Sequence, residues 1–253
     1  YLSSDNKCQK MSENDLFTTR MRKATRRIHS VSDTLVNAKF ALSLRDEAVW
    51  GGGLFVFYHI FAFLEDAKER LNIKKAFEED LAHYLGENWQ STPKSAALEN
   101  YIEHLQDLET EHPTLLLVYV YHLYLGLLSG GQILAKKRKM FGESKYKMSM
   151  YKFKFVLETT SGNVYTDKVT DFNDIDINEL KKEFRNAMNE ISERMSKDEQ
   201  DAFIEESNQV FLMNNLIVNS VGGQNRVLCN MFYKASAILL VVIGVIYAYK
   251  MHK

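Results

Sequence analysis

The sequence predicts an all-α protein: one helical domain followed by an apolar helix at the C-terminus. Only two prolines and 12 glycines interrupt the 253 residues, and apolar side chains recur at helical spacing from about residue 14 to 221. With 45% hydrophobic and 26% charged residues, the composition is that of a packed globular protein. A formal net charge of -1 argues against nucleic acid as a partner, and two cysteines near opposite ends of the chain predict no disulfide framework.

The helices of the domain are expected wherever apolar residues recur three and four positions apart. The predicted ranges are 14–37, 46–71, 73–85, 95–111, 115–141, 177–195 and 197–221. Pro93 and Pro113 stand where two of them begin. Three consecutive glycines at 51–53 would each cost a helix about 1 kcal/mol relative to alanine, which indicates close packing or a loose start. Residues 151–166 alternate aromatic and polar side chains, so a short hairpin or an ordered loop is expected there.

The two ends of the chain differ in character. Residues 1–13 form a polar leader without the apolar core of a secretory signal, so we expect the domain to face the cytosol. Ala235 to Tyr249 carries no charge, and extending the run back to Leu228 gives about 22 residues, enough to cross about 30 Å of hydrocarbon. We therefore predict a helical domain at 14–221, a linker at 222–230 and a transmembrane anchor with a basic tail at 231–253. The alternative is a buried C-terminal core helix.

A histidine and an aspartate on the first helix form a candidate ligand pair. His29 and Asp33 are four residues apart and so share a helix face. The carboxylate can accept the Nδ1 proton and leave Nε2 to bind a metal, the arrangement typical of an oriented histidine ligand. The alternative is an ordinary surface pair. The same helix carries five basic residues between positions 20 and 27, which form either a solvated face or a binding face for anionic groups.

A glycine-rich stretch interrupts the helix at 115–141. Gly126 and Gly130 lie four residues apart on one face, where no side chain would hold a flat ligand away from the backbone. Tight helix crossing is the alternative explanation. Together with a histidine on another helix, the bare backbone predicts a pocket for a flat macrocycle that carries a metal. His122 also lies on the face of Gly126 and is the alternative ligand to His29.

Several segments resemble the heme oxygenase family over about residues 14–221. They are Arg22–His29, Tyr58–Ile60 with Leu64–Glu65, Tyr124–Gln132, Phe184–Asn189 and Phe211–Asn214. The resemblance implies a single helical domain that holds heme b between a proximal helix, where His29 binds the iron and Asp33 orients it, and a distal helix with Gly126 and Gly130. It also implies contacts with the heme propionates and the proximal side, made by Arg22, Thr25, Tyr121, Lys181 and Arg185.

One position departs from the family pattern. Leu127 stands where the family carries an aspartate that holds distal waters and guides proton delivery. Because leucine cannot bind those waters, we expect slower turnover or relaxed regiospecificity, with Gly126, Leu127 and Gly130 forming the catalytic surface.

The function that the resemblance implies is oxidative opening of heme to biliverdin, carbon monoxide and ferrous iron. It implies NADPH-cytochrome P450 reductase as the electron donor, biliverdin reductase as a further candidate partner, and anchoring in the endoplasmic reticulum membrane. The basic run at 136–139 is either part of a reductase docking surface or a solvated helix end. Two alternatives stay open: a heme sensor or buffer of the same fold with little turnover, and a tail-anchored adaptor that binds no cofactor.

Overall fold

The protein is described by a computed structural model that covers residues 16–43, 46–65, 73–140, 165, 167–172 and 175–251. These residues contain α1 (Phe17–Ser43), α2 (Glu47–Glu65), α3 (Ile73–Leu85), α4 (Ala96–Glu111), α5 (Leu116–Gly126), α7 (Ile177–Ser192), α8 (Lys197–Ser220) and α9 (Gln224–Met251). No β-strand occurs within the described ranges, and the predicted all-α fold is confirmed. The leader at 1–13 and nearly all of the expected hairpin at 151–166 lie outside the described residues.

Side-chain caps explain where several helices begin. Ser95 caps α4, and Asp176 caps α7, each by accepting hydrogen bonds from N–H groups of the first turn. Ser196 and Glu199 form a reciprocal capping box at the start of α8. These polar residues precede apolar periodic runs in the sequence, which is why the predicted helix starts agree closely with the observed ones.

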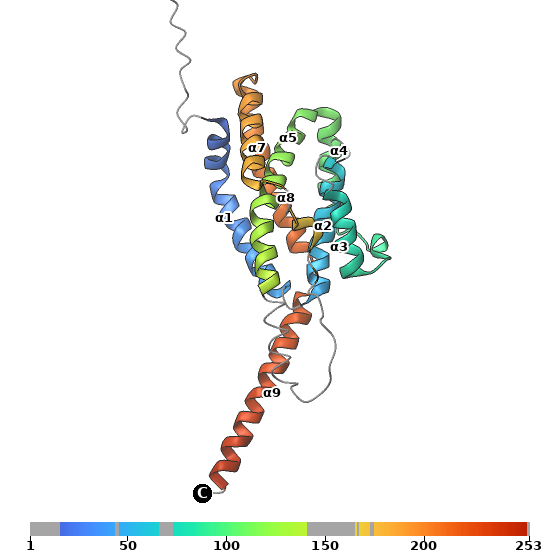
Figure 1. Ribbon diagram of the computed structural model, residues 1–253, viewed down its shortest axis with the longest axis vertical. Coiled ribbons are helices and arrows are strands. Elements are labelled where there is room, and N and C mark those ends of the chain that lie inside the picture. The colour runs from blue at the N-terminus through green and yellow to red at the C-terminus, as the bar shows by residue number, and fades with distance from the viewer. Residues whose placement is uncertain are drawn as a thin grey trace, which may run out of the picture.

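Helix α8 is the central support of the domain. It packs against α1, α4 and α5 and buries Phe203, Val210 and Ile217 in the core (Figure 1). A polar cluster joins α8 to α4 and α5, because Glu206 on α8 accepts a hydrogen bond from the hydroxyl of Tyr119 on α5. His104 Nε2 on α4 lies 2.8 Å from the same carboxylate oxygen. Helices α1 and α5 are therefore both positioned by α8.

The glycines of α2 explain how tightly α3 packs on it. A Cβ atom at Gly51 would lie 2.8 Å from the side chain of Leu85, so close packing is the reason for glycine at this position. A Cβ atom at Gly53, by contrast, would meet nothing within 4 Å.

The basic run at 136–139 divides into exposed and inward-facing residues. Lys136, Lys137 and Lys139 are exposed. Arg138 instead places its guanidinium 4.7 Å from the ring centroids of both Trp50 and Tyr84. Its Nε lies 3.3 Å from a carboxylate oxygen of Asp167, whose side chain is only 4% exposed. Arg138 thus joins α2, α3 and the segment at 167–170, and it is neither a solvated residue nor part of an exposed basic surface.

Replacing Arg138 with alanine is expected to lower the free energy of unfolding by about 3 kcal/mol, because it leaves the buried carboxylate of Asp167 without its cation. Lys139→Ala is the matched control, and we expect it to change stability by no more than about 0.5 kcal/mol. Urea unfolding of the full chain in detergent would measure both values. Equal effects of the two substitutions would contradict the inward role of Arg138.

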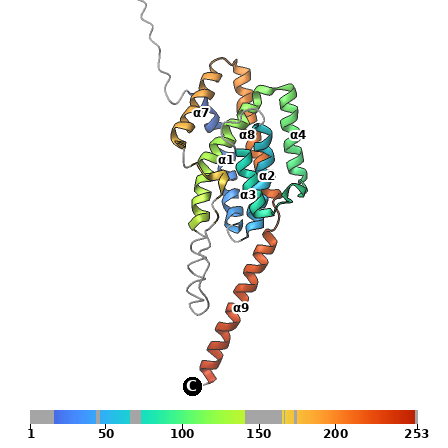
Figure 2. The same cartoon turned by 45° about the vertical axis from the view of Figure 1, so that its right-hand side comes forward.

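Helix α9 projects away from the domain in both views of the molecule (Figures 1 and 2). Among the described residues, three segments are long and apolar enough to cross a membrane: Glu47–Glu65, Pro113–Met140 and Asn225–Met251. The first two are partly buried inside the domain, whereas none of the apolar window of the third is buried. Helix α9 is therefore the candidate membrane anchor.

Most of the predicted linker at 222–230 is helical. Helix α9 begins at Gln224, and Gly223 adopts φ +90°, a left-handed conformation suited to glycine. Arg226 Nη2 lies 2.7 Å from Asp46 Oδ2, and Val227 is buried against the domain. These contacts fix the start of α9 to the domain.

Candidate functional site

The His29 and Asp33 pair is formed on α1 as predicted. His29 Nδ1 lies 3.1 Å from Asp33 Oδ2, and the His29 side chain is 55% exposed. The carboxylate holds the ring through Nδ1 and leaves Nε2 as the nitrogen able to bind a metal. No cluster of three or more His, Cys, Asp or Glu side chains suited to a metal occurs among the described residues. A single imidazole of this kind fits a metal whose other ligands come with it, as in a macrocycle.

The glycine-rich stretch contains a structural feature that the sequence did not predict. Leu127–Gly131 forms a π-helical turn between α5 and the helical residues 132–140. Such turns are rare and occur frequently at functional sites. Gly126 and Gly130 are exposed, and a Cβ atom at either would meet nothing within 4 Å, so helix packing does not require glycine there. The cluster of glycines was the only sequence signal for this turn.

Gly131 and Leu127 pack against each other. A Cβ atom at Gly131 would lie 3.1 Å from the Leu127 side chain, and Gly131 is buried. Tight packing therefore explains Gly131. The Leu127 side chain is partly buried against the core. It carries no polar atom at the position where the heme oxygenase pattern has an aspartate.

Phe211 of α8 connects the two candidate faces. Its ring centroid lies 5.1 Å from that of His29 on α1 and 5.1 Å from that of His122 on α5. Phe211 thus contacts both His29 of α1 and the helix α5, which ends at Gly126. Sequence reasoning assigned no role to Phe211, because neither its type nor its spacing distinguishes it from a core aromatic residue.

The predicted propionate contacts are partly brought together. Tyr121 is buried, and burial raises the pKa of its hydroxyl, while the positive charge of Arg185, a hydrogen bond with Thr18 and the charge of Arg22 act in the opposite direction. Tyr121 of α5 therefore lies within electrostatic reach of one arginine from α7 and one from α1. Lys181 is four residues before Arg185 and shares its helix face.

Thr25 lies on the inner face of α1. Its side chain is buried, and its hydroxyl donates a hydrogen bond to the carbonyl oxygen of Met21, 2.9 Å away. This hydrogen bond fixes the orientation of the Thr25 hydroxyl on the helix that also carries His29.

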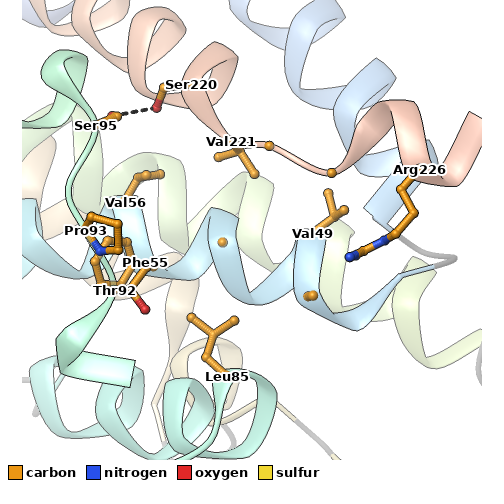
Figure 3. Close-up of a pocket in the computed structure, with 14 residues that line it drawn as sticks. Val49, Phe55, Val56, Leu85, Thr92, Pro93, Ser95, Ser220, Val221 and Arg226 are labelled. Carbon is orange, nitrogen blue, oxygen red and sulfur yellow. Dashed lines mark hydrogen bonds between the residues drawn. The ribbon is translucent and has the colours of Figure 1, made fainter. Parts of the chain in front are cut away.

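Two hollows lie elsewhere on the domain. A cavity of about 320 Å³ is found where α9 leaves the domain, lined among others by Val49, Phe55, Leu85, Val221 and Arg226 (Figure 3). An open hollow of about 530 Å³ lies along the basic face of α1, at Lys23, Ala24, Arg26, Arg27, Ser30 and Val31. Neither hollow is lined by His29 or by the glycines of the π-helical turn.

The all-α domain places the His29 and Asp33 pair of α1 and the helix α5 in contact with the same residue, Phe211, as expected of a domain that holds a flat, metal-bearing macrocycle between two helices. Comparison with known proteins agrees, because the family model for heme oxygenase matches residues 15–220. The chain belongs to the heme oxygenase family.

Individual relatives support this assignment. The chain is 32% identical to human heme oxygenase 1 over 136 residues, which is 46% of each protein, so the alignment spans about half of that relative. Its fold is similar to heme oxygenase 2 from Chlamydomonas reinhardtii, solved without heme, with a TM-score of 0.70, 28% identity and coverage of 82% of this chain and 98% of that one. The fold also resembles heme oxygenase-1 from Synechocystis in complex with heme, with a TM-score of 0.66, 24% identity and coverage of 87% and 98%.

The Asp33 carboxylate can be tested separately from the ligand it orients. We expect Asp33→Asn to weaken heme affinity by about 10- to 100-fold, because the Nδ1 partner sets the orientation and basicity of His29. Heme titration of the full chain would measure this change. Asp107→Asn, an exposed aspartate on α4, is the control and should leave the affinity unchanged. Equal heme affinities for wild type and Asp33→Asn would show that the pair is only a surface contact without a role in heme binding.

A half-buried histidine on α2 predicts acid sensitivity of the fold. Burial, together with the charge of Lys94, lowers the pKa of His59 to about 4, and its buried Nε2 has no hydrogen-bond partner among the described residues. Above pH 6.5 the ring is neutral in both the folded and the unfolded chain, so His59 does not lower the free energy of unfolding. Between pH 6.5 and about pH 4 the ring is protonated in the unfolded chain but not in the folded chain. The free energy of unfolding therefore falls as the pH is lowered across this range.

Allowing for solvent screening of a partly exposed ring, we expect His59 to cost about 1 kcal/mol of stability between pH 7.5 and pH 5. His59→Phe should reduce the pH dependence of urea unfolding by this amount. An unchanged slope would show that the ring is protonated at its ordinary pKa.

Proposed function

We propose that the protein is a membrane-anchored heme oxygenase that opens heme to biliverdin, carbon monoxide and ferrous iron. The observation that carries this proposal is the oriented His29 on α1, joined through Phe211 to the α5 helix that carries Gly126 and Gly130. The donor set fits heme, because one imidazole supplies an axial ligand and the macrocycle supplies the rest. When bound, heme is both the substrate and the group that activates oxygen.

Each residue of the site would bind or orient a different part of the heme. Asp33 holds the His29 ring through Nδ1, so that Nε2 faces the iron. Arg22 and Arg185, whose charges act on Tyr121, would pair with the propionates and fix the rotation of the macrocycle, with Lys181 on the same face of α7. The exposed backbone at Gly126 and Gly130 would allow close approach of the distal face.

Leu127 is expected to affect the course of the reaction. Its side chain packs toward Gly131 and offers no hydrogen bond, so proton delivery on the distal side would depend on other groups. We propose slower turnover and a mixture of biliverdin isomers as the consequence.

The proposal includes an electron donor and a location. Electrons would come from NADPH-cytochrome P450 reductase, and the exposed Lys136, Lys137 and Lys139 offer it a basic surface. Biliverdin reductase is a further candidate partner. The apolar α9 supports anchoring by the C-terminus, and we propose the endoplasmic reticulum membrane with the domain in the cytosol.

The direct test is aerobic turnover of the heme complex with NADPH and the reductase, followed by loss of the Soret band and chromatography of the pigment. Biliverdin is the expected product, as mixed isomers. Leu127→Asp should raise the rate by about 10-fold and narrow the isomer distribution, because it adds a carboxylate able to hold water. A Soret band that persists, or that bleaches without biliverdin, would overturn the proposal.

A heme sensor or buffer with the same fold is the second candidate. The apolar, partly buried Leu127 favours it, because this side chain is unsuited to proton delivery. Both functions require a 1:1 heme complex, so only turnover separates them. Persistent heme with wild-type affinity but without biliverdin would favour the sensor or buffer.

A further inference from the structure

His122 has a buried nitrogen that the fold leaves without a partner. It lies on α5, four residues before Gly126 and therefore on the face that carries the exposed glycines. Its Nε2 is buried and has no hydrogen-bond partner within the described part of the chain. Leaving such an atom unsatisfied costs about 1–3 kcal/mol, so a buried orphan of this kind calls for a functional explanation.

His122 lies close to His29. Both imidazoles pack against Phe211, with centroid distances of 5.1 Å each, so the two imidazole centroids can be no farther apart than the sum of these distances. The ring of His122 also lies edge-on to that of the neighbouring Tyr121, with a centroid distance of 5.1 Å.

The buried nitrogen of His122 suits a metal ligand. It is an imidazole nitrogen that forms no hydrogen bond with any of the described residues. A neutral imidazole with an unpaired nitrogen is the form that binds metals. The residue after Gly126, Leu127, has no polar group that could bind a metal in place of His122.

We propose that His122 is a second ligand of the heme iron, opposite His29, in the resting ferric complex. This inference rests on the proposed binding of heme. A second imidazole would make the iron six-coordinate and low-spin, hold heme more firmly, and close the sixth position to small ligands until His122 moves away. It would also give the protein a way to store heme without reacting, and so join the two candidate functions in one site.

The test compares ferric heme complexes of the full chain by electron paramagnetic resonance, absorption spectra and azide titration. Wild type should be low-spin and bind azide weakly. His122→Leu should be predominantly high-spin and bind azide at least about 10-fold more tightly. His59→Leu is the matched control, since His59 also has a buried, unpartnered Nε2 but lies on α2, and it should behave as wild type.

The outcomes separate this inference from the proposed function. A high-spin wild-type complex that still yields biliverdin would overturn the role of His122 and leave the oxygenase intact. A wild-type chain that binds no heme would overturn both. The spin state of the wild-type complex decides the inference even if a variant does not fold. We expect apo His122→Leu to be at least as stable as wild type, because it removes an unsatisfied polar atom.

Discussion

His29→Ala is expected to lower biliverdin formation by more than about 100-fold, since loss of a ligand should exceed the 10- to 100-fold effect of losing its orienting partner. The structural basis is direct. His29 is the imidazole that the fold orients, through Asp33 at 3.1 Å, and its side chain is 55% exposed on the side of α1 that contacts Phe211. The substitution removes a surface side chain, so stability of the apo chain should change by no more than about 0.5 kcal/mol.

Two controls define the result. His112→Ala, an exposed histidine at the end of α4, should leave turnover unchanged. Added imidazole should restore part of the activity of His29→Ala, because a free ligand can enter the space that the side chain vacates. Full activity of His29→Ala would remove this residue from the site and leave His122 as the remaining imidazole beside Phe211.

The helices could be predicted from the sequence because their signals are local. Apolar residues at helical spacing and polar caps such as Ser95 and Ser196 fix both the type and the start of each helix. The pairing of His29 with Asp33 was predictable for the same reason, because four residues of helix place both side chains on one face.

Contacts between distant segments could not be read from the sequence in this way. Arg138 looked like its three lysine neighbours, and only the folded chain places it between Trp50 and Tyr84. The contact of Phe211 with both His29 and His122 likewise depends on how α8 packs against α1 and α5. The burial of Thr25 could not be predicted until the inner face of α1 was known.

Gly130→Leu is expected to weaken heme affinity by at least about 100-fold, equivalent to about 2.7 kcal/mol, while leaving the apo fold intact. A Cβ atom at Gly130 meets nothing within 4 Å, so the new side chain has room in the apo chain. Replacing glycine in a helix also favours folding by up to about 1 kcal/mol. The same side chain would occupy the space that the flat macrocycle needs, so folding and binding should respond in opposite directions.

Two other glycines make this prediction specific. Gly53→Leu on α2 also introduces a side chain into open space, and it should leave heme affinity unchanged because Gly53 lies outside the site. Gly131→Leu should lower stability, since its Cβ would lie 3.1 Å from Leu127. Heme titration together with urea unfolding of the three variants measures both effects. Wild-type affinity in Gly130→Leu would mean that heme does not approach this helix, and the proposed pocket would then be wrong.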